Sequence, residues 1–134
     1  MTSTVIYSGN LRTSATHLQS GNTLETDAPT DNQGKGERFS PTDLVATALG
    51  SCMMTIMGIK ARDLNIPLEG LQIGISKHMA ADPRRISGID VVLQFPAGLT
   101  LDEKEKTILE RAALTCPVFQ SIHPDIVVNT EFRY

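Results

Sequence analysis

The amino-acid sequence predicts an α+β fold, in which strands and helices come in runs rather than in strict alternation. Alternating apolar and polar residues, typical of β-strands, occupy the first thirty residues and residues 70–96. Residues 40–64 and 101–115 instead carry apolar residues at helical spacing. A short helix and a last strand, 125–133, complete the expected order, which is β-β-β, α, β-β, α, short α, β.

The composition indicates one globular domain. A chain of 134 residues has room for one core, so we expect a single domain over residues 1–134. Hydrophobic residues make up 40% and charged residues 20%, a balance that is far from that of disordered chains. The net charge of -3 offers no basic field for phosphates, so we expect no nucleic-acid partner.

Neither a secretory leader nor a membrane span is visible in the sequence. The first residues lack a positively charged segment followed by an apolar run and a cleavage site, so we expect a cytoplasmic protein. The longest mostly apolar stretch, Leu44–Ile59, contains Thr47, Ser51 and Thr55 and is too short and too polar to cross a bilayer. We therefore interpret it as a buried helix and expect no membrane partner.

Turn residues divide the first thirty residues into three short strands. The signals Ser8-Gly9-Asn10 and Ser20-Gly21-Asn22 separate segments that alternate between apolar and small polar residues. We expect a β-meander over residues 1–30. Residues 28–37 have no apolar anchor, and we expect a loop there that is longer than usual.

The start of the central helix is the strongest local signal. Ser40 is a capping residue, Pro41 suits the first helical position, and Asp43 lies where the helix dipole favours an acid. Apolar and small residues follow at Leu44, Val45, Ala48, Leu49, Cys52, Met53, Ile56 and Ile59. This helix, 40–64, is apolar on more than one side, so we expect a sheet on one face and a second copy of the chain on the other.

The second half of the chain predicts a hairpin, two helices and a strand. Apolar residues with a period of two form two strands of a long antiparallel hairpin over 70–96, with Asp82-Pro83 between them. The helix over 101–115 begins with acids, and Cys116-Pro117 then starts a short helix, because proline favours its first position. The strand at 125–133 completes the sheet.

Two cysteines are the candidate reactive groups. In a reducing cytosol they are more naturally thiols than a structural disulfide. Cys52 lies about three turns into its helix, beyond the reach of the helix dipole, so a reactive thiolate there needs a positive neighbour. Arg38, just ahead of the helix, is the nearest candidate, and it can reach Cys52 of its own chain or of a partner chain.

Local electrostatics favour Cys116 instead, since a helix N-terminus stabilises a thiolate. Spacing alone does not decide which thiol attacks first, and the alternative that both cysteines are buried apolar residues stays open. We expect no metal site, because His17, His78 and His123 are widely separated and no C-x-x-C or H-x-x-x-H spacing occurs. We also expect no cofactor.

Two motifs resemble those of one family. The segment from Ser40 to Cys52, SPTDLVATALGSC, is similar to the cysteine-bearing helix of OsmC-like proteins, of the OsmC/Ohr (osmotically induced / organic hydroperoxide resistance) type. Thr115-Cys116-Pro117-Val118 resembles that family's second-cysteine motif. The resemblance covers nearly the whole chain. It implies antiparallel sheets packed on a long central helix, in an intertwined homodimer with active sites at the interface.

The resemblance also implies a chemistry. A thiol-dependent peroxidase is expected, in which Cys52 attacks an organic hydroperoxide, or less readily hydrogen peroxide, and becomes a sulfenic acid. Cys116 then condenses with it to a disulfide, which an external dithiol such as a lipoylated protein reduces. These roles imply a function in oxidative stress defence.

The charges that support the cysteine differ from the family pattern. Ohr-type members carry an arginine in the N-terminal sheet region and a glutamate immediately after the helix-start proline, where this sequence has Thr42. Asp43 and Glu37 are possible substitutes, and Arg38 rather than Arg12 is the expected arginine. An alternative function on the same scaffold is a non-enzymatic protein that binds a small molecule or a partner, which the missing glutamate and the Met-rich helix favour.

Overall fold

The computed structural model describes all 134 residues, which form two compact units, residues 1–45 and 46–134. The first unit holds β1 (Ser3–Gly9), β2 (Arg12–His17), β3 (Thr23–Asp27), the 3₁₀ turn η1 (Thr30–Asn32) and the start of α1 (Pro41–Asp63). The rest of α1 belongs to the second unit, with β4 (Gln72–Ala80), β5 (Arg85–Gln94), α2 (Glu103–Leu114), α3 (Pro117–Ser121) and β6 (Val127–Arg133). The α+β class is confirmed, whereas a single domain stays a prediction.

The first unit is an antiparallel meander in the order β1-β2-β3, as the turn signals indicate. The loop expected at 28–37 is folded against itself, because the backbone N–H groups of Gly34 and Gly36 donate to the carbonyls of Pro29 and Ala28. A Cβ atom at Gly34 would lie 1.7 Å from the carbonyl oxygen of Ala28, so only glycine fits there. The loop thus has a defined shape.

The first unit buries none of its apolar side chains. Its buried residues are Thr26, Asp27 and Ser40, all of them polar. The apolar run Val5, Ile6 and Tyr7 of β1 is 63%, 68% and 65% exposed. Because successive strand residues point to opposite faces, both faces of this sheet present apolar side chains that its own unit leaves uncovered.

Reciprocal hydrogen bonds fix the start of α1. The backbone N–H of Asp43 donates to Ser40 Oγ at 3.1 Å, and the backbone N–H of Ser40 donates to Asp43 Oδ2 at 2.8 Å. With Pro41 at the first helical position, this is the predicted cap.

The buried side of α1 is one narrow stripe, formed by Ala46, Leu49, Gly50, Met53, Met57 and Ala61. Val45 and Ile59 lie outside it and are about two-fifths exposed, at 41% and 42%. By length and mean hydropathy, 1.5 over an 18-residue window, the 23-residue α1 meets a compositional criterion for a bilayer span. The expectation concerned the shorter stretch Leu44–Ile59, and the core helix of a soluble protein passes the same test, so the absence of a membrane partner stays a prediction. Its buried stripe nevertheless belongs to the hydrophobic core.

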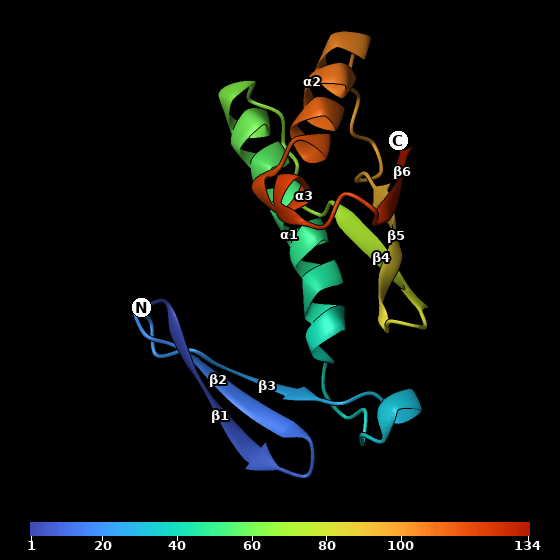
Figure 1. The fold of residues 1–134 in the computed structure, drawn as a ribbon. Helices are drawn as coiled ribbons and strands as arrows, with labels where there is room; N and C mark the ends of the chain where they lie inside the picture. The colour runs from blue at the N-terminus through green and yellow to red at the C-terminus, as the bar shows by residue number, and fades with distance from the viewer. The chain divides into compact units, whose positions relative to one another are not determined.

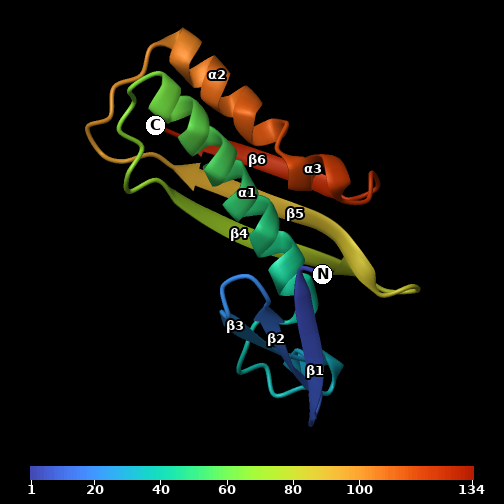
Figure 2. The same ribbon diagram turned by 90° about the vertical axis from the view of Figure 1, so that its left-hand side faces the viewer.

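The sheet of the second unit has the order β4-β5-β6 and lies beside α1 (Figure 2). The hairpin β4-β5 is antiparallel, as predicted, but β6 pairs with β5 in parallel. The expectation of antiparallel sheets therefore fails for this one pairing. The reason is the connection: α2 and α3 carry the chain back across the sheet, so β6 enters from the same end as β5.

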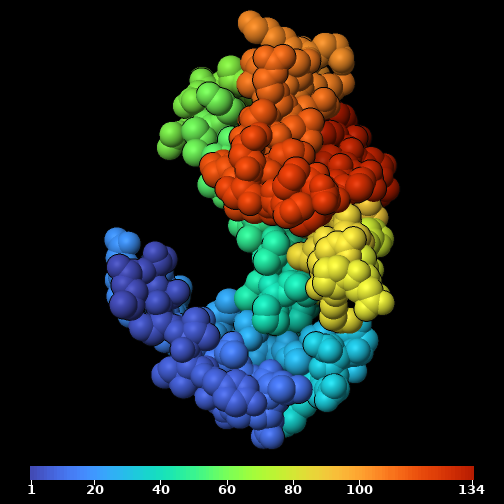
Figure 3. Space-filling view, in the orientation of Figure 1, coloured from blue at the N-terminus to red at the C-terminus, as the bar shows by residue number.

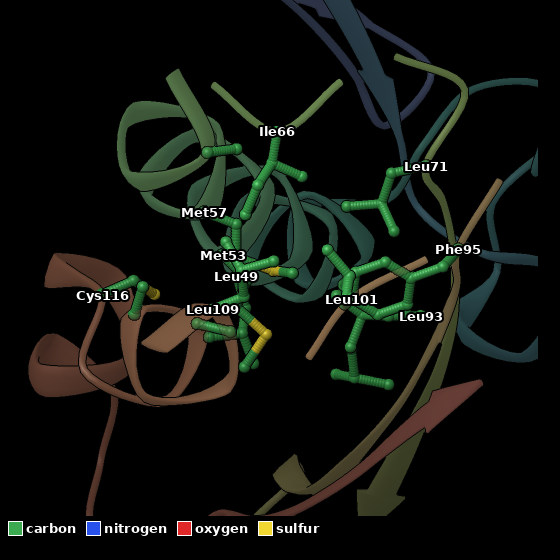
Figure 4. Close-up of a cluster of buried hydrophobic side chains, with 14 of the residues drawn as sticks. Leu49, Met53, Met57, Ile66, Leu71, Leu93, Phe95, Leu101, Leu109 and Cys116 are labelled. Atoms are coloured by element: carbon green, nitrogen blue, oxygen red, sulfur yellow. The ribbon is translucent and has the colours of Figure 1, made fainter. Parts of the chain in front are cut away.

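The core lies between α1, α2 and this sheet. Leu49, Met53 and Met57 of α1 pack with Leu93 and Phe95 near the end of β5 and with Leu109 of α2 (Figure 4). Cys116 lies at the edge of the same cluster, on the side of Leu109. In the space-filling view α2 and α3, orange to red, form one continuous surface (Figure 3).

Candidate functional site

Cys52 lies in the middle of α1 and is half-buried. It packs against the core, but it is outside the stripe of fully buried residues on its helix. Its position deep in the helix means that the helix dipole does not reach it.

Cys116 is completely buried, with 0% of its surface exposed. It is the N-cap of α3, and its sulfur accepts a hydrogen bond from the backbone N–H of Phe119 at 3.5 Å. The expected stabilisation of the thiolate by a helix start is thus present, but burial outweighs it and raises the pKa of the Cys116 thiol. Cys116 is therefore held in its protonated, weakly nucleophilic form.

The structure brings the two cysteines together. Both are free thiols, and the nearby Cys52 further raises the pKa of Cys116. The local reason is the chain path, since α2 runs beside α1 and the junction at Thr115 starts α3 next to the middle of α1 (Figures 1 and 2). Two neighbouring thiols, one accessible and one enclosed, have the arrangement of an attacking and a resolving cysteine.

Arg38 belongs to the first unit, where its guanidinium is already engaged. Its Nε donates to Glu25 Oε2 at 3.0 Å, and its Nη1 donates to the carbonyl of Glu37 at 3.1 Å. The side chain is 46% exposed and borders an open hollow of about 690 Å³ together with Phe39 and Asp43. Its assignment as the activating cation stays a prediction.

The acids suggested as substitutes for the family glutamate have other partners. Asp43 caps α1, and the carboxylate of Glu37 accepts from Arg12 rather than from Arg38. Thr42, in the glutamate's place, lies 3.2 Å from the hydroxyl of Ser40 and belongs to the cap. Glu25 of β3 is the acid that pairs with Arg38, and the sequence analysis did not identify it.

The best-fixed guanidinium in the first unit is that of Arg12. Its Nε and Nη2 donate to the two carboxylate oxygens of Asp27 at 2.6 Å and 2.8 Å, and Nη2 also donates to Glu37 at 2.8 Å. Asp27 is 2% exposed, and the hydrogen bonds from Arg12 hold the pKa of its carboxyl below the usual range. The carboxylates in turn raise the pKa of Arg12.

The sequence analysis missed the role of Asp27 in this pair. The signal that could have found it is the hairpin register, because Arg12 and Asp27 are cross-strand partners at the ends of β2 and β3. The turn at residues 20–22 suggests such a pairing, but the exact register needs the strand ends. No group of three or more His, Cys, Asp or Glu side chains is arranged to hold a metal ion.

Comparison with protein families matches residues 34–131 to the model described as OsmC-like protein. A solved structure from Psychrobacter arcticus 273-4, named for an osmotic stress induced and detoxification response, shares 56% sequence identity. The match covers 99% of this chain and 96% of that one, with a TM-score of 0.94. Comparison with curated proteins finds no match.

Two more distant structures share the fold. An organic hydroperoxide resistance protein OsmC from Legionella pneumophila is 18% identical, with a TM-score of 0.76 over 100% of this chain and 98% of that chain. The organic hydroperoxide resistance protein OhrB of Bacillus subtilis is also 18% identical, with a TM-score of 0.65 over 99% of this chain and 98% of that chain. At this identity the likeness concerns the fold alone.

Proposed function

Since this chain belongs to the OsmC-like protein family, we propose that it is a thiol-dependent peroxidase that reduces organic hydroperoxides. The observation that carries the proposal is the neighbouring pair of free thiols, Cys52 and Cys116. The names of the Legionella pneumophila and Bacillus subtilis structures, which refer to organic hydroperoxide resistance, support this substrate class over hydrogen peroxide. A role in oxidative stress defence follows.

The first step uses Cys52 as the nucleophile. Its thiolate attacks one peroxide oxygen, the O–O bond breaks, and the alkoxide that leaves takes up a proton to become an alcohol. Cys52 is then a sulfenic acid. The difference in burial supports this assignment, because Cys116 is enclosed and its pKa is raised, whereas Cys52 is only partly buried.

The second step closes the disulfide. The sulfur of Cys116 displaces the oxygen of the Cys52 sulfenic acid, which leaves as water, and an S–S bond forms. An external dithiol, for example a lipoylated protein, then reduces the disulfide by thiol exchange and is itself oxidised to a disulfide. Both cysteines return to the thiol state, as the cycle requires.

Activation of Cys52 needs a permanent cation, and the first unit supplies two candidates. Arg38 remains our choice, because its side chain is exposed and borders an open hollow. The second candidate, Arg12, lies in the N-terminal sheet and is held by two acids, as the arginine of Ohr-type members is held by its glutamate. A guanidinium next to the sulfur stabilises the thiolate and then the departing oxygen.

We further propose that the protein is a cytoplasmic homodimer. The uncovered apolar side chains of β1 and the exposed Val45 and Ile59 of α1 support a second copy of the chain as the missing cover. Two unbridged thiols are consistent with a reducing compartment.

Peroxide consumption by cysteine variants tests the chemistry. With cumene hydroperoxide and a dithiol in a stopped-flow assay, Cys52→Ser should lose turnover completely. Without the dithiol, Cys116→Ser should still consume one equivalent of peroxide per subunit and then accumulate a sulfenic acid, which a dimedone adduct on Cys52 reports by mass spectrometry. Unchanged turnover in Cys52→Ser would contradict the proposal and favour a non-enzymatic binding role.

Matched arginine variants identify the activating cation. We expect Arg38→Gln to slow Cys52 oxidation at least tenfold, in line with the loss of a positioned charge, and Arg12→Gln to slow it less. The rate of Cys52 alkylation by a maleimide at pH 6 is the second measurement, since it follows the thiolate fraction without peroxide chemistry. If Arg12→Gln alone lowers both rates, the role belongs to Arg12.

A further inference from the structure

A groove between α1 and α2 is lined by two cations that form no ion pair. It has a volume of about 300 Å³. Lys60 of α1 lines it, together with Thr107, Ile108, Arg111 and Ala112 of α2 and with Thr115, the residue after α2. All of these residues belong to the second unit, and the two helices lie side by side in both ribbon views (Figures 1 and 2). The lining contains two cations and no carboxylate.

None of the acids of α2 forms an ion pair with Lys60 or Arg111, because each is directed to another group. Glu103 forms an ion pair with Lys106 at 2.8 Å, and Glu105 accepts a backbone N–H at the start of the helix. Glu110 accepts the hydroxyl of Tyr134 at 2.7 Å. In a chain with a net charge of -3, the groove is thus a local region of opposite sign, which favours an anion.

The remaining lining restricts what kind of anion fits. The hydroxyls of Thr107 and Thr115 donate to the backbone carbonyls of Glu103 and Arg111, each at 2.7 Å, so their hydrogens are already used. The lining also includes the apolar side chains of Ile108 and the buried Ala112. A ligand therefore meets donors only at the cations and apolar surface elsewhere.

We propose that this groove binds a small amphipathic carboxylate, with the carboxylate between Lys60 and Arg111 and a short alkyl chain against Ile108 and Ala112. A bidentate guanidinium contact suits a carboxylate, and the volume lies at the lower end of that of small-molecule sites. The proposal does not depend on the peroxidase chemistry, because neither cation belongs to the cysteine site.

Octanoate is the probe that tests the site on the full-length protein. Calorimetric titration should give saturable binding with one octanoate per subunit, and amide resonances of residues 107–115 should shift in an NMR titration. Acetate, which lacks the chain, and octanol, which lacks the charge, should each bind at least tenfold more weakly. Added salt should weaken octanoate binding, because the charged ends are exposed.

Charge-removing variants of similar shape provide the controls. Lys60→Gln and Arg111→Gln should each weaken octanoate binding about tenfold or more, whereas Lys104→Gln, an exposed residue of α2 outside the lining, should leave it unchanged. Thermal melts show that each variant is folded. Octanoate binding that does not saturate, that survives both Lys60→Gln and Arg111→Gln, or that acetate matches would overturn the proposal.

Discussion

At the residue scale, Cys116 shows how two effects on one thiol compete. The backbone N–H of Phe119 stabilises its thiolate, but complete burial favours the neutral thiol, and burial prevails. A neutral Cys116 thiol reacts slowly with peroxide, so it remains a thiol until Cys52 has become a sulfenic acid. The direction of this pKa shift is therefore compatible with the division of roles that we propose.

The raised pKa of Cys116 has a measurable consequence for stability. Above the ordinary thiol pKa of 9.0, the unfolded chain loses this proton while the folded chain keeps it, so the folded state binds more protons. The free energy of unfolding should then fall as the pH rises above about 9, by at most ~1.4 kcal/mol per pH unit for this group. Urea denaturation between pH 7 and 10 measures this slope.

Serine variants provide the comparison for that slope. Cys116→Ser keeps a capping side chain at the start of α3 but removes the titrating group, so its stability should fall less between pH 8 and 10. Cys52→Ser serves as the control and should retain most of the slope. Parallel pH profiles for the wild type and Cys116→Ser would show that burial does not control this thiol.

At the scale of elements, two glycines of α1 distinguish the effect of side-chain packing on stability from the effect of helix propensity. A Cβ atom at Gly50 would lie 2.7 Å from Cδ1 of Ile75 and 3.2 Å from Cδ1 of Ile73, so this glycine lets α1 approach β4 closely. At Gly58 a Cβ atom would meet nothing within 4 Å. The same substitution should therefore act in opposite directions at the two positions.

We expect Gly50→Ala to destabilise the protein by about 1 kcal/mol, because the ends of the partly buried Ile73 and Ile75 side chains must shift. Gly58→Ala should stabilise it by about 0.5–1 kcal/mol, since alanine loses less backbone entropy in a helix. Chemical denaturation of both variants measures the difference. Stabilisation by Gly50→Ala would mean that α1 does not rest on β4 as closely as the structure describes.

At the scale of the whole molecule, the first unit raises the question of what covers it. Residues 1–45 fold into a sheet without a buried apolar side chain, which is unfavourable for a unit that stays alone in water. In the homodimer that we propose, a second copy of the chain covers these apolar side chains. Light scattering should then give twice the mass of the 14.5 kDa chain.

A charge placed in β1 tests that proposal. Ile6→Glu should weaken the dimer by on the order of 2 kcal/mol, about 30-fold in Kd, because it would bury an unpaired carboxylate. Gln19→Glu, an exposed polar position in the turn between β2 and β3, adds the same charge and should leave the dimer intact. Equal masses for the two variants at all concentrations would show that β1 is not the interface.

The sequence by itself determined the elements of this protein and their order, because local signals specify them. The cap at Ser40 to Asp43, the period-two strands and the start at Cys116-Pro117 act within a few residues of the chain. The two cysteines were identified as candidates for the same reason: thiols in an otherwise cysteine-free chain are visible without a structure.

Only the tertiary structure decided the relations between distant residues. Segments far apart in the chain meet in the parallel pairing of β6 with β5, in the contact between Cys52 and Cys116, and in the ion pair of Asp27 with Arg12. The burial that raises the pKa of Cys116 likewise comes from distant segments. Register and packing set these relations, and a local pattern contains neither. The partners of Glu25 and Glu37 stayed hidden from the sequence analysis for that physical reason.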